Sequence, residues 1–124
     1  MFDHVQLKVS DYAKTRPFYE AVMQTLGYGV VFEDENVVGF GTNPHDMFEI
    51  RQANEKVPLS AATHIAFVAK SEDAVRTFHK TALELGAQDN GAPNFRDYEP
   101  GYFAAFVIDP NGHNLEAVFK KYRK

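Results

Sequence analysis

Two histidines and two glutamates stand at matched places in the two halves of this 124-residue sequence. His4 and His64 each lie in the first strand pattern of their half, and Glu49 and Glu116 each lie in the last. Two imidazoles and two carboxylates form a mixed ligand set that suits an octahedral divalent ion with two positions left for water or substrate. Such an ion polarises a bound carbonyl or hydroxyl and eases removal of a proton beside it. The sequence therefore predicts a metal centre if the two halves pack as equivalents.

The segment Asp109–Phe119, DPNGHNLEAVF, gives the strongest reason to expect a cation. A Pro-Asn-Gly turn leads into a strand pattern that sets Glu116 among apolar residues. An ionised carboxylate is costly to bury unless a cation, a donor or a metal lies beside it, and one ion would serve Glu49 as well. The alternative for Glu49 is a surface carboxylate paired with Arg51 or Lys8. For the histidines, the alternative is an ordinary place in the core or at its rim.

The elements that must position these four residues follow one order in both halves. Apolar residues alternate in the expected strands, recur at helical spacing in the expected helices, and are separated by caps and turns. The first half predicts a strand at Phe2–Val9, a helix capped by Ser10 or Asp11 (with Thr15 as a second candidate cap) and ending at Gly27, and strands at Gly29–Phe32, Asn36–Gly41 and Asp46–Arg51. The second half predicts a strand at Thr63–Ala69, a helix capped by Ser71 and ending at Gly86, a strand near Ala87–Gln88, and strands at Tyr102–Ile108 and His113–Phe119.

The matched spacing of the two halves indicates an internal duplication. His4 precedes Phe18 by 14 residues, and His64 precedes Phe78 by the same 14. Strand–helix–three strands, repeated, predicts an α+β fold in one domain over residues 1–124. Its parts are module one at about 1–51, a linker at 52–61, module two at 62–119 and a tail at 120–124.

A long loop is predicted after Gln88, because Asp89–Gly101 is rich in Gly, Pro and Asn. Aromatic and basic side chains in or beside this loop would cover the metal and contact substrate. The candidates are Phe95, Arg96, Tyr98, Tyr102 and Phe103. Arg51, on the same strand face as Glu49, would clamp a substrate carboxylate or phosphate. For all of these residues the alternative is ordinary packing or a solvated sheet edge.

Composition excludes several classes of function. The net charge of −4 argues against nucleic-acid binding, which normally requires a basic face. Without cysteine there is no disulfide, no thiolate nucleophile and no cysteine-type zinc site. No apolar run approaches membrane-spanning length and no targeting segment precedes the first strand pattern. We therefore expect a soluble, cytoplasmic protein with a small-molecule substrate.

The segments DHVQLKV, THIAFVA and DPNGHNLEAVF, in their duplicated arrangement, resemble the vicinal oxygen chelate superfamily. This superfamily includes glyoxalase I, bleomycin- and fosfomycin-resistance proteins and extradiol dioxygenases. The resemblance covers essentially the whole chain and is greatest to small glyoxalase-like members. It implies two βαβββ modules whose mixed sheets form a cupped half-barrel around a metal, commonly in a homodimer.

The resemblance also implies roles for individual residues. His4, His64 and Glu116 match metal positions that are widely used in the family, and Glu49 matches the fourth ligand of glyoxalase I-like members. The ion would be Ni, Co, Zn, Mn or Fe. Glu49 or Glu116 would take a proton from the carbon next to a carbonyl, the metal would hold the enediolate, and the same carboxylate would return the proton. No clear glutathione-binding set of Arg and Asn is present, so the leading hypothesis is a glyoxalase I-type lyase or isomerase with an unidentified substrate.

Two other functions remain open on the sequence. An extradiol-type dioxygenase would hold iron by His4, His64 and Glu116 alone, and Glu49 counts against it because a fourth ligand occupies a position that oxygen or the diol needs. A metal-free, bleomycin-type binding protein would use the same fold with an aromatic-lined groove.

Overall fold

The computed structural model describes residues 1–123, and the chain divides into two compact units, Met1–Ala61 and Ala62–Lys124. Of the predicted tail, residue 124 lies outside the described part. Neither helix in the described part is long and apolar enough to cross a membrane.

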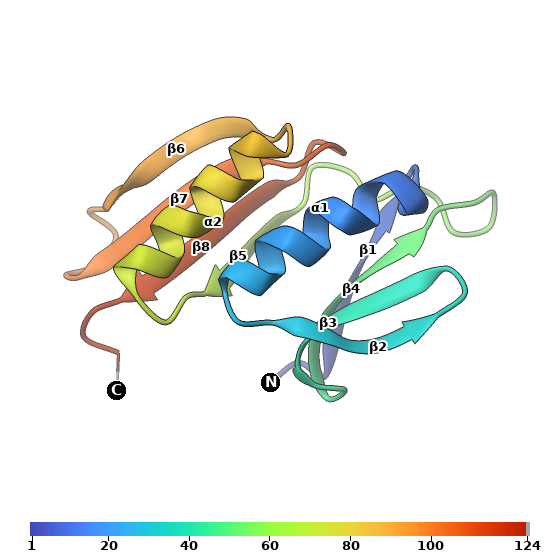
Figure 1. Ribbon diagram of the computed structural model, residues 1–124, viewed down its shortest axis with the longest axis horizontal. Coiled ribbons are helices and arrows are strands. Elements are labelled where there is room, and N and C mark those ends of the chain that lie inside the picture. Colours follow the sequence, from blue (N-terminus) through green and yellow to red (C-terminus); the bar gives the residue numbers. More distant parts are fainter. Residues whose placement is uncertain (124) are drawn as a thin grey trace. The chain divides into compact units, whose positions relative to one another are not determined.

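Unit 1 is a strand, a helix and three further strands (Figure 1). These are β1 (His4–Val9), α1 (Tyr12–Thr25), β2 (Gly29–Asp34), β3 (Val37–Asn43) and β4 (Asp46–Gln52). The sheet order is β1-β4-β3-β2, and only the β1–β4 pairing is parallel. The first and last strands of the unit therefore lie side by side, which brings the His4 strand next to the Glu49 strand.

The N-cap of the first helix is Asp11, one of the predicted caps. Asp11 accepts a hydrogen bond from the Lys14 backbone N–H at 3.1 Å, as an N-cap does. Thr15 is buried inside the helix, so the alternative start at Thr15 is wrong. On the buried face Tyr19 packs against Phe48 of β4, with ring centroids 5.3 Å apart, and this contact holds α1 on the sheet.

Unit 2 repeats the same order of elements. They are β5 (His64–Val68), α2 (Glu72–Glu84), β6 (Gln88–Phe95), β7 (Tyr102–Ile108) and β8 (Asn114–Lys120), with sheet order β5-β8-β7-β6 and a parallel β5–β8 pair. The helix α2 contacts β6, β7 and β8 (Figure 1). Ser71 caps α2 by accepting from the Ala74 backbone N–H at 3.0 Å, as predicted. The predicted α+β class and the two βαβββ modules with mixed sheets are confirmed.

One stretch of unit 2 differs from the prediction. Residues 89–95, predicted as part of a long loop, belong to the eight-residue strand β6. The strand pairs with β7 in a register that shifts on both sides of Gly91, where φ is +151°. Pro93 is tolerated because β6 is an edge strand. Bulges, a glycine and a proline remove the alternation by which a strand is recognised in sequence.

Candidate functional site

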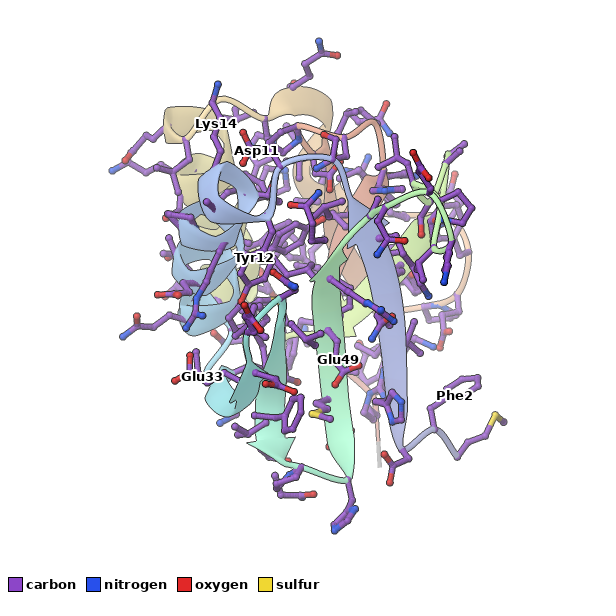
Figure 2. The ribbon with its side chains drawn as sticks, turned by 90° about the vertical axis from the view of Figure 1, so that its right-hand side faces the viewer. Phe2, Asp11, Tyr12, Lys14, Glu33 and Glu49 are labelled. Carbon is purple, nitrogen blue, oxygen red and sulfur yellow. The ribbon has the colours of Figure 1, made fainter. Side chains whose placement is uncertain are left out.

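In unit 1 the proposed ligands lie on the sheet face opposite to α1. Phe48 and Ile50 of β4 are buried on the helix side, so Glu49 and Arg51 point the other way. Figure 2 shows the Glu49 side chain at the middle of β4. The parallel register places Gln6 of β1 directly opposite Glu49.

Glu49 is a buried carboxylate with a single neutral donor. It is 5% exposed, and Gln6 Nε2 donates to its Oε1 at 2.9 Å. On the other side lies Gly39, where a Cβ would contact Glu49 Cγ at an ordinary 3.4 Å but would clash with Met47 Sδ at 2.7 Å. Neither Arg51 nor Lys8 forms an ion pair with it in the described part of the chain, so the alternative of a surface carboxylate paired with them is wrong. The burial of this charge is thus compensated only in part.

His4 is oriented by a carboxylate of its own. Its Nδ1 donates to Asp3 Oδ1 at 2.7 Å, and this bond, with the nearby charge of Glu49, raises the pKa of His4. The bond to His4, followed by one to His45, lowers the pKa of Asp3. With Nδ1 engaged in this way, Nε2 is the ring nitrogen left to act as a ligand. A carboxylate on the far nitrogen is the usual support of a metal-binding histidine.

In unit 2 the glutamate has two partners. Glu116 is 2% exposed, its Oε1 lies 2.9 Å from His64 Nε2, and the Tyr102 hydroxyl donates to its Oε2. The residue opposite Glu116 on β5 is Ala66, whose small side chain leaves His64 free to reach the carboxylate. Burial, and then the hydrogen bond to Glu116, raise the pKa of Tyr102, so the phenol stays protonated and remains a donor.

Each unit by itself holds one imidazole and one carboxylate, which are side chains of the kind that bind divalent ions. The 2.9 Å between His64 Nε2 and Glu116 Oε1 is a hydrogen-bond distance, so this imidazole and this carboxylate lie next to each other within unit 2. No group of three or more His, Cys, Asp and Glu side chains able to hold a metal occurs among residues 1–123.

Comparison with protein families decides the relationship. The family model described as Glyoxalase/Bleomycin resistance protein/Dioxygenase superfamily matches residues 1–117. The chain belongs to this superfamily. Comparison with curated protein sequences gives no significant match.

Solved structures of the superfamily share the fold. A glyoxalase/bleomycin resistance protein from Albidiferax ferrireducens T118 is 26% identical, with a TM-score of 0.82 over 96% of this chain and 98% of the other. A glyoxalase-related enzyme from Fulvimarina pelagi is 18% identical, with a TM-score of 0.72 over 96% and 87%. A lactoylglutathione lyase from Agrobacterium tumefaciens is also 18% identical, with a TM-score of 0.67 over 96% and 92%. At 18% identity the last two likenesses concern the fold alone.

The side chains predicted to contact substrate separate into two groups. Tyr102 lies on the Glu116 side of its sheet, Tyr98 packs against it edge to face with ring centroids 5.0 Å apart, and Arg96 lies 5.3 Å from the Phe106 ring centroid. Phe103 points to the opposite face and is buried there, with the Arg76 guanidinium of α2 lying 4.9 Å from its ring centroid. We therefore leave Phe103 out of the proposed site.

Two residues that hold proposed ligands of unit 1 were not predicted from the sequence. Asp3 orients His4, and Gln6 holds Glu49. A signal for Gln6 existed, because it lies two residues after His4 on the same strand face. Which side chain lies opposite Glu49, however, depends on the register between β1 and β4.

Proposed function

We propose that this chain is a divalent-metal-dependent lyase or isomerase of the glyoxalase I type. It would move a proton at a carbon next to a carbonyl in a small substrate, with His4, Glu49, His64 and Glu116 as the metal ligands. The observation that carries the proposal is the pair of buried glutamates at one strand position in both units, neither paired with Lys or Arg in the described part. The ligands would come from one chain or from two chains of a homodimer.

The hydrogen bonds suggest different roles for the two glutamates. Both oxygens of Glu116 have partners, so it is suited to stay in place as a ligand. Glu49 accepts one hydrogen bond through Oε1, which leaves Oε2 to take and return the substrate proton. A general base must reach its proton directly or through one water, and a carboxylate with one free oxygen meets that need.

A bound divalent ion would polarise the substrate oxygens and stabilise the negative charge that develops on them. The protein's own contribution is to aim the ligands. Asp3 fixes the ring of His4, Gln6 holds Glu49, and Tyr102 holds Glu116. Ni, Co, Zn, Mn and Fe all suit two imidazoles with two carboxylates.

Hydrogen exchange into candidate substrates tests the reaction without knowledge of the product. The metal-loaded protein would be incubated in D2O with small 2-oxoaldehydes, their thiol adducts and hydroxyketones, and deuterium at the carbon next to the carbonyl would be followed by NMR. With both proteins saturated with excess metal, we expect Glu49→Gln to lower the metal-dependent exchange by about 100-fold or more, in line with the usual contribution of a general base. Exchange at the wild-type rate in Glu49→Gln would contradict the assigned role.

One observation favours a second function, a metal-free binding protein. Tyr102 and His64 already satisfy both oxygens of Glu116 within unit 2, so this carboxylate tolerates burial without an ion. The alternative of an extradiol dioxygenase is supported only by membership of the superfamily. Catechol cleavage by the iron-loaded protein that survives Glu49→Ala would favour the dioxygenase, and absence of metal binding would favour the binding protein.

A further inference from the structure

Two cations lie directly opposite one another on the Glu49 face of unit 1. The parallel register pairs Lys8 of β1 with Arg51 of β4, one step beyond the Gln6–Glu49 pair. Both side chains are half-buried. Strands lie about 4.8 Å apart in a sheet, so the two positive side chains leave the backbone as neighbours.

In the described part of the chain, neither cation has a protein counter-ion. Within residues 1–123 no carboxylate lies within 4.0 Å of the Lys8 ammonium or the Arg51 guanidinium, and no side-chain hydrogen bond of either group is found. The chain carries 17 acidic against 13 basic residues, so acids are not scarce. Like charges directly opposite each other destabilise a sheet. The pairing therefore carries a cost that no contact in unit 1 offsets.

We infer that Lys8 and Arg51 bind an oxyanion, the carboxylate or phosphate group of the substrate. The arginine fork matches two oxygens of such a group, and the lysine supplies a point charge beside it. The backbone at Lys8 is held on both sides of the residue, because its N–H donates to Ser60 Oγ at 2.9 Å and its carbonyl accepts from the Ser60 N–H at 3.1 Å. The ammonium thus extends from a fixed point of the strand.

The position of the two cations narrows the substrate class. Two residues along a strand span roughly 7 Å, so the oxyanion would lie about that far from Glu49. This step rests on the proposed function. The substrate is then a small carbonyl compound that carries a carboxylate or phosphate a few bonds from the carbon that loses its proton.

Anion binding by the full-length protein in the presence of a chelator tests this inference apart from any metal. Inorganic phosphate and acetate would be titrated separately at constant ionic strength, with chloride as the balancing ion, and the dissociation constants read from amide NMR shifts. We expect shifts at Lys8 and Arg51 and binding about tenfold or more weaker in Lys8→Gln and in Arg51→Gln. The matched control Lys70→Gln removes an exposed lysine of unit 2 and should bind as the wild type does.

The remaining outcomes each decide a point. Tighter binding of phosphate supports a phosphate ester, and equal or tighter binding of acetate supports a carboxylate. Equal dissociation constants in wild type and both variants, or an equal loss of affinity in Lys70→Gln, would overturn the inference.

A further variant, Arg51→Lys, keeps the charge and should lose part of the anion affinity. Thermal unfolding without anion should show both Gln variants as stable as wild type or more so, whereas destabilisation would indicate a structural role and count against the inference. Anion binding by a protein that binds no metal would contradict the proposed function and would still support the anion site.

Discussion

Glu49 and Glu116 stand at the same strand position in their units but have different neighbours. Across the parallel pair Glu49 is opposite Gln6, while Glu116 is opposite Ala66. Gln6 donates to Glu49, and His4 bonds instead to the adjacent Asp3. In unit 2 the alanine makes no such bond, and the histidine reaches its glutamate directly.

The two units therefore share a buried carboxylate at the matching strand position and differ in the groups that hold it. Glu49 has one neutral amide donor and one oxygen without a partner among residues 1–123, and Glu116 has a phenol and an imidazole. A ligand that also acts as the base needs an oxygen free to take the proton, whereas a ligand alone does not, and the partners of Glu49 and Glu116 fit that difference.

The largest expected effect comes from neutralising the fixed ligand. Glu116→Gln should weaken binding of Co²⁺ or Zn²⁺ about 100-fold or more, because residues that merely support a ligand already account for 10- to 100-fold. Isothermal titration calorimetry measures it, with the exposed Glu84→Gln as control. Equal affinities in the variant and the control would remove Glu116 from the site.

Removing the phenol of unit 2 should mainly affect stability. Tyr102→Phe deletes a hydrogen bond to a buried charge, and we expect a loss of about 1.5–3 kcal/mol in the free energy of unfolding of the metal-free protein. The matched control is Tyr98→Phe, since Tyr98 is exposed and packs edge to face against Tyr102, and it should change stability by less than about 0.5 kcal/mol. Urea unfolding with chelator present compares them, and equal losses would mean that the hydroxyl of Tyr102 contributes nothing specific.

Replacing Gln6 with alanine, the residue at the matching position of unit 2, should lower stability by a smaller amount. Gln6→Ala removes the amide donor to Glu49, and we expect a loss of about 1 kcal/mol, since water can enter the space that the amide leaves. The same variant frees Glu49 Oε1, so His4 should turn from Asp3 towards Glu49, which amide and imidazole NMR shifts would report. Exposed Gln24→Ala is the control. An unchanged His4 environment would show that Gln6 is not what separates the two units.

The smallest effect concerns a polar pair on the helix of unit 2. His79 of α2 lies 2.9 Å from Asp89, and the matching residue of α1 is Tyr19, whose ring contacts Phe18 and Phe48. The bond to His79 lowers the pKa of Asp89 below its ordinary 3.8. A lowered carboxyl pKa contributes stability that is present above the unfolded-state value and is lost as pH falls through the folded-state value.

Asp89→Asn should therefore unfold more easily than wild type near pH 6, and the difference should shrink below about pH 4. Urea midpoints from pH 3 to pH 6 measure it, with Asp97→Asn in an exposed turn as control. A difference that stays constant with pH would contradict the link between Asp89 and His79.

Sequence reasoning predicted the order of elements well, because alternation and matched spacing depend only on local chain order. It failed at β6, where Gly91 and Pro93 interrupt the alternation of a bulged strand. The hydrogen-bond partners of Glu49 and Glu116 also could not be predicted from the sequence. That Arg51 shares a face with Glu49 follows from period two, but whether they pair depends on rotamers and register, which only packing decides.

The proposed function requires that His4, Glu49, His64 and Glu116 together hold one divalent ion. Metal content after saturation with Ni²⁺, Co²⁺ or Zn²⁺ and removal of excess ion, measured by elemental analysis against protein concentration, tests it most directly. We predict one ion per chain in the wild type and in the Glu84→Gln control, and a loss of tight binding when any one of the four ligands is replaced. Wild-type protein that retains no metal, or an ion that survives all four replacements, would contradict the claim.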